Sequence, residues 1–182
     1  ALVHETKRVF GHLDSVVCNA GIDIIKPAVS YAPEEWDAVL AVNLKGAFLV
    51  AQSAARMWIG LEQRDVSISF TASIACSIGL PMLAPYAASK GGINQLVRTL
   101  AVEWAEHGIR VNAVAPGYVQ NIMSGVTLHA DSSSEKRIQQ FTPLGRRATV
   151  DEIAAPFVFL ASPAASYITG AVLAVDGGYT AL

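Results

Sequence analysis

The feature that most constrains the fold of this chain is a regular alternation of short apolar runs with longer helical patterns. The apolar runs predict buried β-strands, and they occupy residues 13–21, 66–73, 109–117 and 171–178. Apolar residues recur at helical spacing between them, over residues 2–10, 33–59, 86–107 and 150–162. Strands that alternate with helices form βαβ units, whose right-handed crossovers place helices on both faces of a parallel sheet. The pattern therefore predicts an α/β fold with a doubly wound parallel sheet.

Composition narrows the classes of function. The 182 residues fit one domain, and the net charge of −2 comes without a basic cluster, which disfavours a nucleic-acid partner. Cys18 and Cys76 do not make a disulfide framework, and no Cys/His spacing suggests a metal site. We find no apolar run of the ~18 residues that a membrane helix needs, so we expect no membrane partner and a cytoplasmic location.

Small and polar residues follow three of the predicted strands. They are Asn19, Ala20 and Gly21 after the first strand, Ser73 at the end of the second, and Pro116 and Gly117 at the end of the third. Ligands of open α/β sheets bind beyond the carboxyl ends of the strands. We expect these residues to crowd one rim of the sheet.

A tyrosine and a lysine stand four residues apart on the helix that follows the second strand. Tyr86 and Lys90 share a helix face, and an ammonium near a phenol stabilises the phenolate and lowers its pKa towards a value useful in acid–base catalysis. Ser73 could hydrogen-bond a substrate oxygen. Asn43, a poor helix former in mid-helix, indicates a local distortion and a polar role. Each residue alone has an ordinary structural explanation, as a solvated pair or a turn residue, and only the joint arrangement favours catalysis.

With these motifs in this order, the chain resembles the classical short-chain dehydrogenases/reductases. The matching segments span residues 9–179 and read FGHLDSVVCNAG, WDAVLAVNLKGAFLVAQ, FTASIA, PYAASKGG, IRVNAVAPGYV, PLGR, DEIA and VDGGY. Within that family, the last part of the chain most resembles 3-oxoacyl-carrier-protein reductases and small sugar or polyol dehydrogenases. The resemblance implies NAD or NADP as cofactor and reversible oxidation of a secondary alcohol to a ketone.

The resemblance also implies a role for each matching residue. It implies four catalytic residues, namely Asn43, Ser73, Tyr86 and Lys90, with Tyr86 as the acid/base. It implies that the cofactor lies near nine residues, namely Asn19, Ala20, Gly21, Tyr86, Lys90, Pro116, Gly117, Val119 and Asn121. The segment 120–141 would cover the substrate, within a stretch, 118–148, that we expect to be irregular.

One motif of the family has no counterpart in these residues. The family begins with a strand and a glycine-rich TGxxxGxG turn that holds the pyrophosphate, and no such motif occurs here. We therefore expect residues 1–182 to be the C-terminal part of a single Rossmann-type domain, without its first three strands, and to bind cofactor poorly alone. The residue that distinguishes NAD from NADP belongs to the missing part.

Two other interpretations stay open. The chain could be a catalytically incompetent fragment or structural subunit that cannot bind the dinucleotide, or a sugar-binding module without redox chemistry. For the enzyme interpretation, the implied partners are a small alcohol or ketone and further copies of the chain. The helices 33–59 and 86–107 would form a dimer interface, repeated into a homotetramer.

Overall fold

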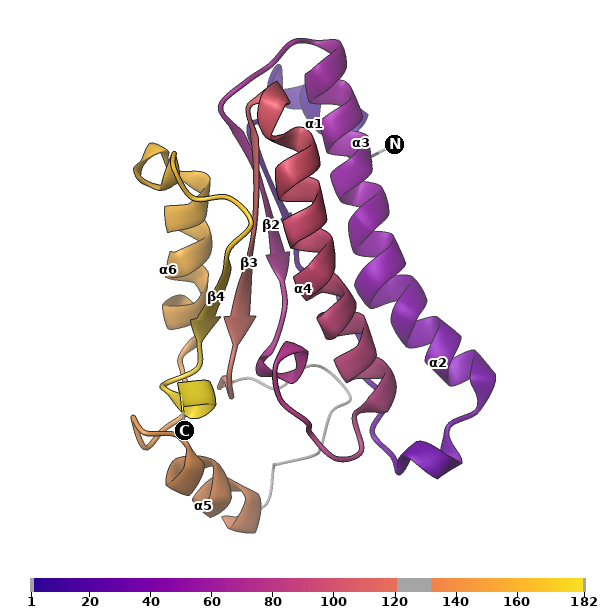
Figure 1. Cartoon of the computed structure of the whole chain (residues 1–182), viewed down its shortest axis with the longest axis vertical. Coiled ribbons are helices and arrows are strands. Elements are labelled where there is room, and N and C mark those ends of the chain that lie inside the picture. The colour runs from indigo at the N-terminus through magenta and orange to yellow at the C-terminus, as the bar shows by residue number, and fades with distance from the viewer. Residues whose placement is uncertain (1, 121–131, 182) are drawn as a thin grey trace.

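The core of the molecule is a four-stranded parallel sheet, seen in the computed structural model of the chain (Figure 1). The structure describes residues 2–120 and 132–181. The strands lie in the order β1-β2-β3-β4 and comprise β1 (Ser15–Cys18), β2 (Val66–Thr71), β3 (Ile109–Pro116) and β4 (Val172–Val175). Each strand pairs in parallel with the next one in the chain. The predicted parallel sheet is therefore confirmed.

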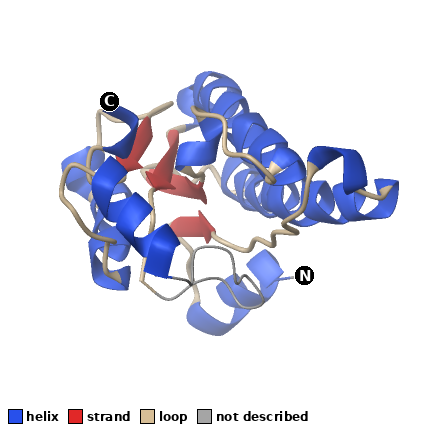
Figure 2. Ribbon diagram, turned by 90° about the horizontal axis from the view of Figure 1, so that it is seen from below, coloured by secondary structure: helices blue, strands red, loops and turns tan. Residues whose placement is uncertain are grey.

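Helices cover both faces of this sheet (Figure 2). The α-helices are α1 (Leu2–Phe10), α2 (Pro33–Leu40), α3 (Ala47–Gly60), α4 (Ala84–Trp104), α5 (Ser132–Phe141) and α6 (Val150–Ala161). Short 3₁₀ turns are η1 (Ala28–Ser30), η3 (Ile74–Cys76), η4 (Ala105–His107), η5 (Pro163–Ala165) and η6 (Tyr179–Ala181). Helices α3 and α4 pack on one face, and α6 packs on the other. This layering is the doubly wound arrangement that the alternation predicts.

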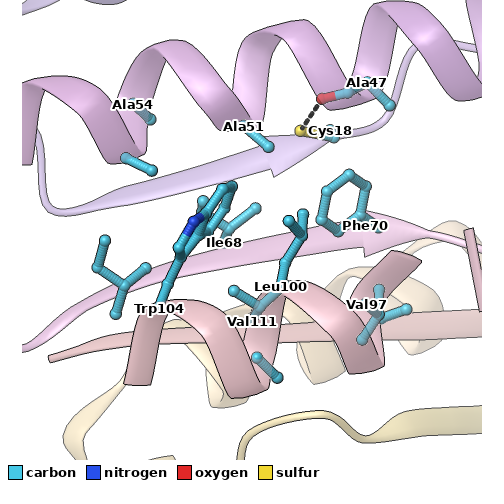
Figure 3. Packing of buried hydrophobic residues seen from close by; sticks show 14 of the residues in the cluster. Cys18, Ala47, Ala51, Ala54, Ile68, Phe70, Val97, Leu100, Trp104 and Val111 are labelled. Carbon is cyan, nitrogen blue, oxygen red and sulfur yellow. Dashed lines mark hydrogen bonds between the residues drawn. The ribbon is translucent and has the colours of Figure 1, made fainter. Parts of the chain in front are cut away.

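The main core lies between the sheet and the helices α3 and α4. Figure 3 shows Ile68 and Phe70 of β2 and Val111 of β3 among small α3 side chains and larger α4 side chains. Ala51 and Ala54 are fully buried, and their small size lets α3 approach the strands closely. Trp58, also fully buried, donates from Nε1 to the carbonyl oxygen of Leu13 at 2.7 Å. This core fixes the position of both helices relative to the rim.

The predicted helix 33–59 is interrupted at its centre. Between α2 and α3 the backbone forms a π-helical turn, η2 (Ala41–Gly46), which contains Asn43. The local distortion expected at Asn43 is confirmed. π-Turns inside α-helices often occur at functional sites, because the extra residue turns one side chain out of the regular helical pattern.

The segment 118–148 is less irregular than expected, because it contains the helix α5. Its Ile138 side chain is 3% exposed, and Glu135 forms an ion pair with Arg147 at 2.7 Å. The sequence of α5 is polar and has no continuous apolar stripe, so its pattern does not predict a helix. A few contacts with the rest of the fold stabilise it instead. Asn121 and residues 122–131, part of the predicted substrate-covering segment, lie outside the described residues.

The helical run from α2 to α3 also corrects our statement about apolar runs. Taken together, Pro33–Gly60 is long and apolar enough to cross a membrane by length and composition alone. Core helices of water-soluble proteins pass the same test. Ala51, Ala54 and Trp58 of this run are buried against the sheet, and 28% of its most apolar window is buried in all.

Candidate active site

The parallel strands bring their carboxyl ends to one rim, as the sequence predicts. Asn19 follows β1, Ser73 follows β2, Gly117 follows β3, and Asp176 follows β4. The ends of β1 and β2 are linked by a hydrogen bond, in which the hydroxyl of Thr71, the last residue of β2, donates to Asn19 Oδ1 at 2.8 Å. Residues from segments far apart in the sequence therefore meet at the rim.

Tyr86, Lys90 and Ser73 come together at this rim. The Lys90 ammonium lies 5.5 Å from the centre of the Tyr86 ring. The Ser73 hydroxyl lies near the Tyr86 phenol, and its interaction with the phenolate favours ionisation and lowers the phenol pKa. Ser73 itself is held because its Oγ accepts the Ala75 N–H at 3.2 Å, which starts the turn η3. Two hydroxyl groups and one ammonium thus share a small, largely buried volume.

Lys90 is anchored by a residue that the sequence analysis does not single out. Its Nζ donates to the carbonyl oxygen of Thr71 at 2.6 Å, and the side chain is only 4% exposed. Burial lowers the Lys90 pKa to about 8, although the Asp23 carboxylate acts in the opposite direction. Thr71 therefore supports the site twice, through its carbonyl to Lys90 and through its hydroxyl to Asn19. Nothing in its strand pattern distinguishes it beforehand.

Asn43 fixes the segment after β1. Its Oδ1 accepts the N–H of Ile22 at 2.8 Å, and its Nδ2 donates to the Ile22 carbonyl at 2.9 Å and to Ser89 Oγ at 3.1 Å. Ser89 in turn donates to the carbonyl oxygen of Tyr86 at 2.7 Å. Both amide hydrogens of Asn43 are therefore engaged by protein. The side chain links the Ile22 backbone to the turn of α4 that carries Tyr86.

Two predicted cofactor residues, Gly21 and Gly117, lie at the same rim, and Pro116 and Val119 are close to it in the chain. A Cβ built on Gly21 would lie 3.4 Å from Asn43 Oδ1 and 3.8 Å from Lys90 Nζ, so the Gly21 backbone adjoins the site. Gly117 has no room for a side chain, because a Cβ there would lie 2.8 Å from the Asp176 Cα. Pro116 ends β3, and Val119 forms an isolated parallel bridge with Ala148.

The pKa of Tyr86 departs from our expectation. We expect Lys90 to lower it, yet the phenol pKa is raised. Burial is the largest cause, because it disfavours the charged phenolate, and it outweighs the hydrogen bond from Ser73. The negative charge of Asp23 raises the phenol pKa further. The Lys90 ammonium lies over the ring, 5.5 Å from its centre.

Asp23 is the other titratable residue that the sequence analysis misses. It is half-buried, and burial raises its pKa to about 6, although the Ile24 N–H and the Lys90 charge favour the ionised form. It acts electrostatically on both Tyr86 and Lys90. Its sequence context, directly after Gly21 and Ile22, could have drawn attention to it. The structure thus adds a carboxylate to the predicted group.

Because the Asp23 pKa is raised in the folded protein, the residue should make stability depend on pH. Its contribution is fully present below the unfolded-state pKa of about 3.9 and is lost as the pH rises through about 6. Asp23→Asn keeps the hydrogen-bonding oxygen and removes the charge. We expect this variant to be more stable than the parent at pH 8 and equally stable near pH 4. Denaturation midpoints measured across this range give the check, and a constant difference would contradict it.

A parallel α/β sheet with a tyrosine, a lysine and a serine gathered at its carboxyl rim defines a Rossmann-type oxidoreductase. A family model described as "Enoyl-(Acyl carrier protein) reductase" matches residues 1–180. The chain is 40% identical over 179 residues to 2-dehydro-3-deoxy-D-gluconate 5-dehydrogenase from Pseudoalteromonas atlantica, which covers 98% of this chain and 69% of that protein. The chain belongs to the short-chain dehydrogenases/reductases.

Solved structures agree with this membership. The crystal structure of a gluconate 5-dehydrogenase from Burkholderia cenocepacia in complex with NADP and tartrate matches with a TM-score of 0.93 and 36% identity, covering 99% of this chain and 69% of that chain. A 4-hydroxyisoleucine dehydrogenase complexed with NADH matches with a TM-score of 0.92 and 25% identity, covering all of this chain and 74% of that chain. Both of these proteins are dehydrogenases whose structures contain a nicotinamide cofactor.

Proposed function

We propose that the protein interconverts a secondary alcohol and a ketone with NAD or NADP, with Tyr86 as the acid/base. The observation that carries the proposal is the convergence of Ser73, Tyr86 and Lys90 at the carboxyl rim of the sheet. The nicotinamide dinucleotides seen in relatives support the choice of cofactor. The Tyr86 phenolate would accept the hydroxyl proton, and the Ser73 hydroxyl would orient the same substrate oxygen.

The residues at the rim fit the nicotinamide end of a dinucleotide. The Lys90 ammonium has three donors, of which the bond to Thr71 uses one, so it can also donate to ribose hydroxyls. The Gly21 backbone adjoins this ammonium, since a Cβ at Gly21 would lie 3.8 Å from Lys90 Nζ. When bound, the nicotinamide accepts or supplies the hydride. The 182 residues contain no glycine-rich turn for the pyrophosphate.

Lys90→Met tests the proposal, because it keeps the apolar stem and removes the charge. In the complete gene product that contains these residues, we expect nicotinamide binding to weaken and turnover to fall by at least about tenfold. Titration of nicotinamide fluorescence and assays of a secondary-alcohol panel with both cofactors measure these effects. Lys45→Met, at an exposed position of η2, is the matched control. A parent protein that binds neither dinucleotide would favour the structural-subunit alternative instead.

Exposed apolar residues support self-association through α3 and α4. Leu49 of α3 is 49% exposed and Val102 of α4 is 83% exposed. These side chains leave apolar surface on both helices that a further copy of the chain could cover. We therefore infer a homodimer or homotetramer through the helices 33–59 and 86–107. Light scattering of the complete gene product tests it, and a monomer would contradict it.

The two free cysteines are consistent with a cytoplasmic location.

A further inference from the structure

The proposed reaction does not use Asp23, although its charge acts on Tyr86 and Lys90 and the backbone two residues before it, at Gly21, adjoins Lys90 Nζ. The backbone around it is fixed on both sides. Asn43 bonds to both the N–H and the carbonyl of Ile22, and the Tyr31 phenol contacts the carbonyl oxygen of Ile24. Asp23 Oδ1 accepts the Ile24 N–H at 2.8 Å. The carboxylate therefore has a defined place at the rim rather than the freedom of a surface side chain.

One carboxylate oxygen of Asp23 remains available. Over residues 2–120 and 132–181, the structure shows no protein hydrogen bond to Asp23 Oδ2. The nearby cation Lys26 is engaged elsewhere, since its Nζ bonds to both carboxylate oxygens of Glu35 at 2.6 and 2.7 Å. Lys90 acts on Asp23 electrostatically, but its described hydrogen bond goes to Thr71. An acceptor with negative charge thus acts electrostatically on Tyr86 and Lys90. It stands two residues after Gly21, whose backbone adjoins Lys90 Nζ.

We propose that Asp23 determines substrate specificity, accepting a hydroxyl hydrogen from a neutral, polyhydroxylated substrate and repelling substrates with a carboxylate or phosphate next to the reacting carbon. This inference rests on the proposed function, because it assumes that the substrate binds beside Tyr86. The named relatives include a gluconate 5-dehydrogenase crystallised with tartrate, a dicarboxylate. The charge of Asp23 predicts that this chain prefers a neutral polyol to a dicarboxylate such as tartrate.

Charge repulsion at Asp23 also sets the size of the expected change in affinity. Two like charges in a partly buried site repel each other enough to change affinity by about tenfold or more. A neutral polyol suffers no such repulsion and gains a hydrogen bond to a charged acceptor, which is stronger than a bond to a neutral one. Discrimination of acids from polyols should therefore depend on this one carboxylate.

A matched pair of probes tests the inference, namely L-tartrate and L-threitol, which differ only in their terminal groups. Affinities are measured by calorimetry on the complete gene product, with and without NADP. We expect the parent protein to bind tartrate no more tightly than threitol. Asp23→Asn should strengthen tartrate binding by about tenfold and weaken threitol binding. The control Asp37→Asn removes an exposed carboxylate of α2 and should change neither affinity.

The pH dependence supplies a second measurement on the parent protein. Lowering the pH from about 7 to about 5 protonates Asp23, and tartrate should then bind more tightly. The charged and titratable groups near Asp23 are Lys90, Tyr86, Tyr31, Lys26 and Glu35. All of them remain in Asp23→Asn, so this variant should lose most of the pH effect.

The outcomes separate the inference from the proposed function. Tighter binding of tartrate than threitol by the parent protein would overturn the role of Asp23, as would an unchanged tartrate affinity in Asp23→Asn. Either result leaves the proposed function intact if the protein binds nicotinamide and oxidises an alcohol. Failure of nicotinamide binding would instead refute the proposed function, while the tartrate and threitol affinities without NADP would still test Asp23.

Discussion

Tyr86→Phe should lower kcat by about a thousandfold, because a general acid or base contributes roughly 10²–10⁴-fold to catalysis. The substitution removes one oxygen and keeps the ring that packs near the Lys90 ammonium. Nicotinamide binding should therefore change little, since Lys90 and its bond to Thr71 remain. Steady-state kinetics and fluorescence titration of the complete gene product separate the two effects.

The pH profile of the parent protein belongs to the same prediction. Burial raises the Tyr86 pKa, so the phenol is mostly protonated near neutral pH. Alcohol oxidation needs the phenolate, and its rate should rise with pH through the alkaline range. Tyr167→Phe, at a fully exposed position, is the control and should have no effect. Substantial turnover by Tyr86→Phe would remove Tyr86 from the mechanism.

Trp58→Ala should destabilise the fold by about 3–5 kcal/mol, the usual cost of removing a large buried aromatic side chain. Trp58 is fully buried on α3, and its Nε1 donates to the Leu13 carbonyl just before β1. The substitution leaves a cavity beneath the sheet and breaks this link. Because the free energy of unfolding of a native protein is only about 5–15 kcal/mol, this substitution would remove a large fraction of it.

Thermal and urea denaturation of the complete gene product measure this effect. We expect the Tm to fall by roughly 10 °C or more. Trp36→Ala removes the same side chain at a position that is 39% exposed on α2, and it should cost about 1 kcal/mol or less. Equal losses for the two tryptophans would contradict the packing that we describe.

Much of the fold follows from local pattern. The four strands and the helices between them were predictable because apolar runs and helical spacing repeat in a strict order. The parallel pairing then follows from the connections, since a helix between two strands returns the chain to the same end of the sheet. Helix α5 was not predictable, because it depends on the ion pair between Glu135 and Arg147 and on the burial of Ile138.

The candidate site shows the same division. Asn43 could be identified in advance, because an asparagine in the middle of a predicted helix is unusual. The structure then shows a π-turn at this residue. Thr71 and Ser89 could not, because each looks like an ordinary strand or helix residue until its neighbours are known. The prediction that Lys90 lowers the Tyr86 pKa is wrong for a related reason. Spacing on a helix predicts that Lys90 is near, but only coordinates show how strongly burial opposes ionisation.

The sequence by itself determined the order of the elements, the parallel sheet and the rim at which Ser73, Tyr86 and Lys90 meet. These depend on spacing and connection, which are local properties of the chain. The tertiary structure decided how readily the groups near the reacting atoms ionise and which side chains are held in place by hydrogen bonds. Those properties depend on burial and on contacts between distant segments, such as Asn43 with Ile22 and Lys90 with Thr71. The electrostatics of a site therefore become visible only after the chain has folded around it.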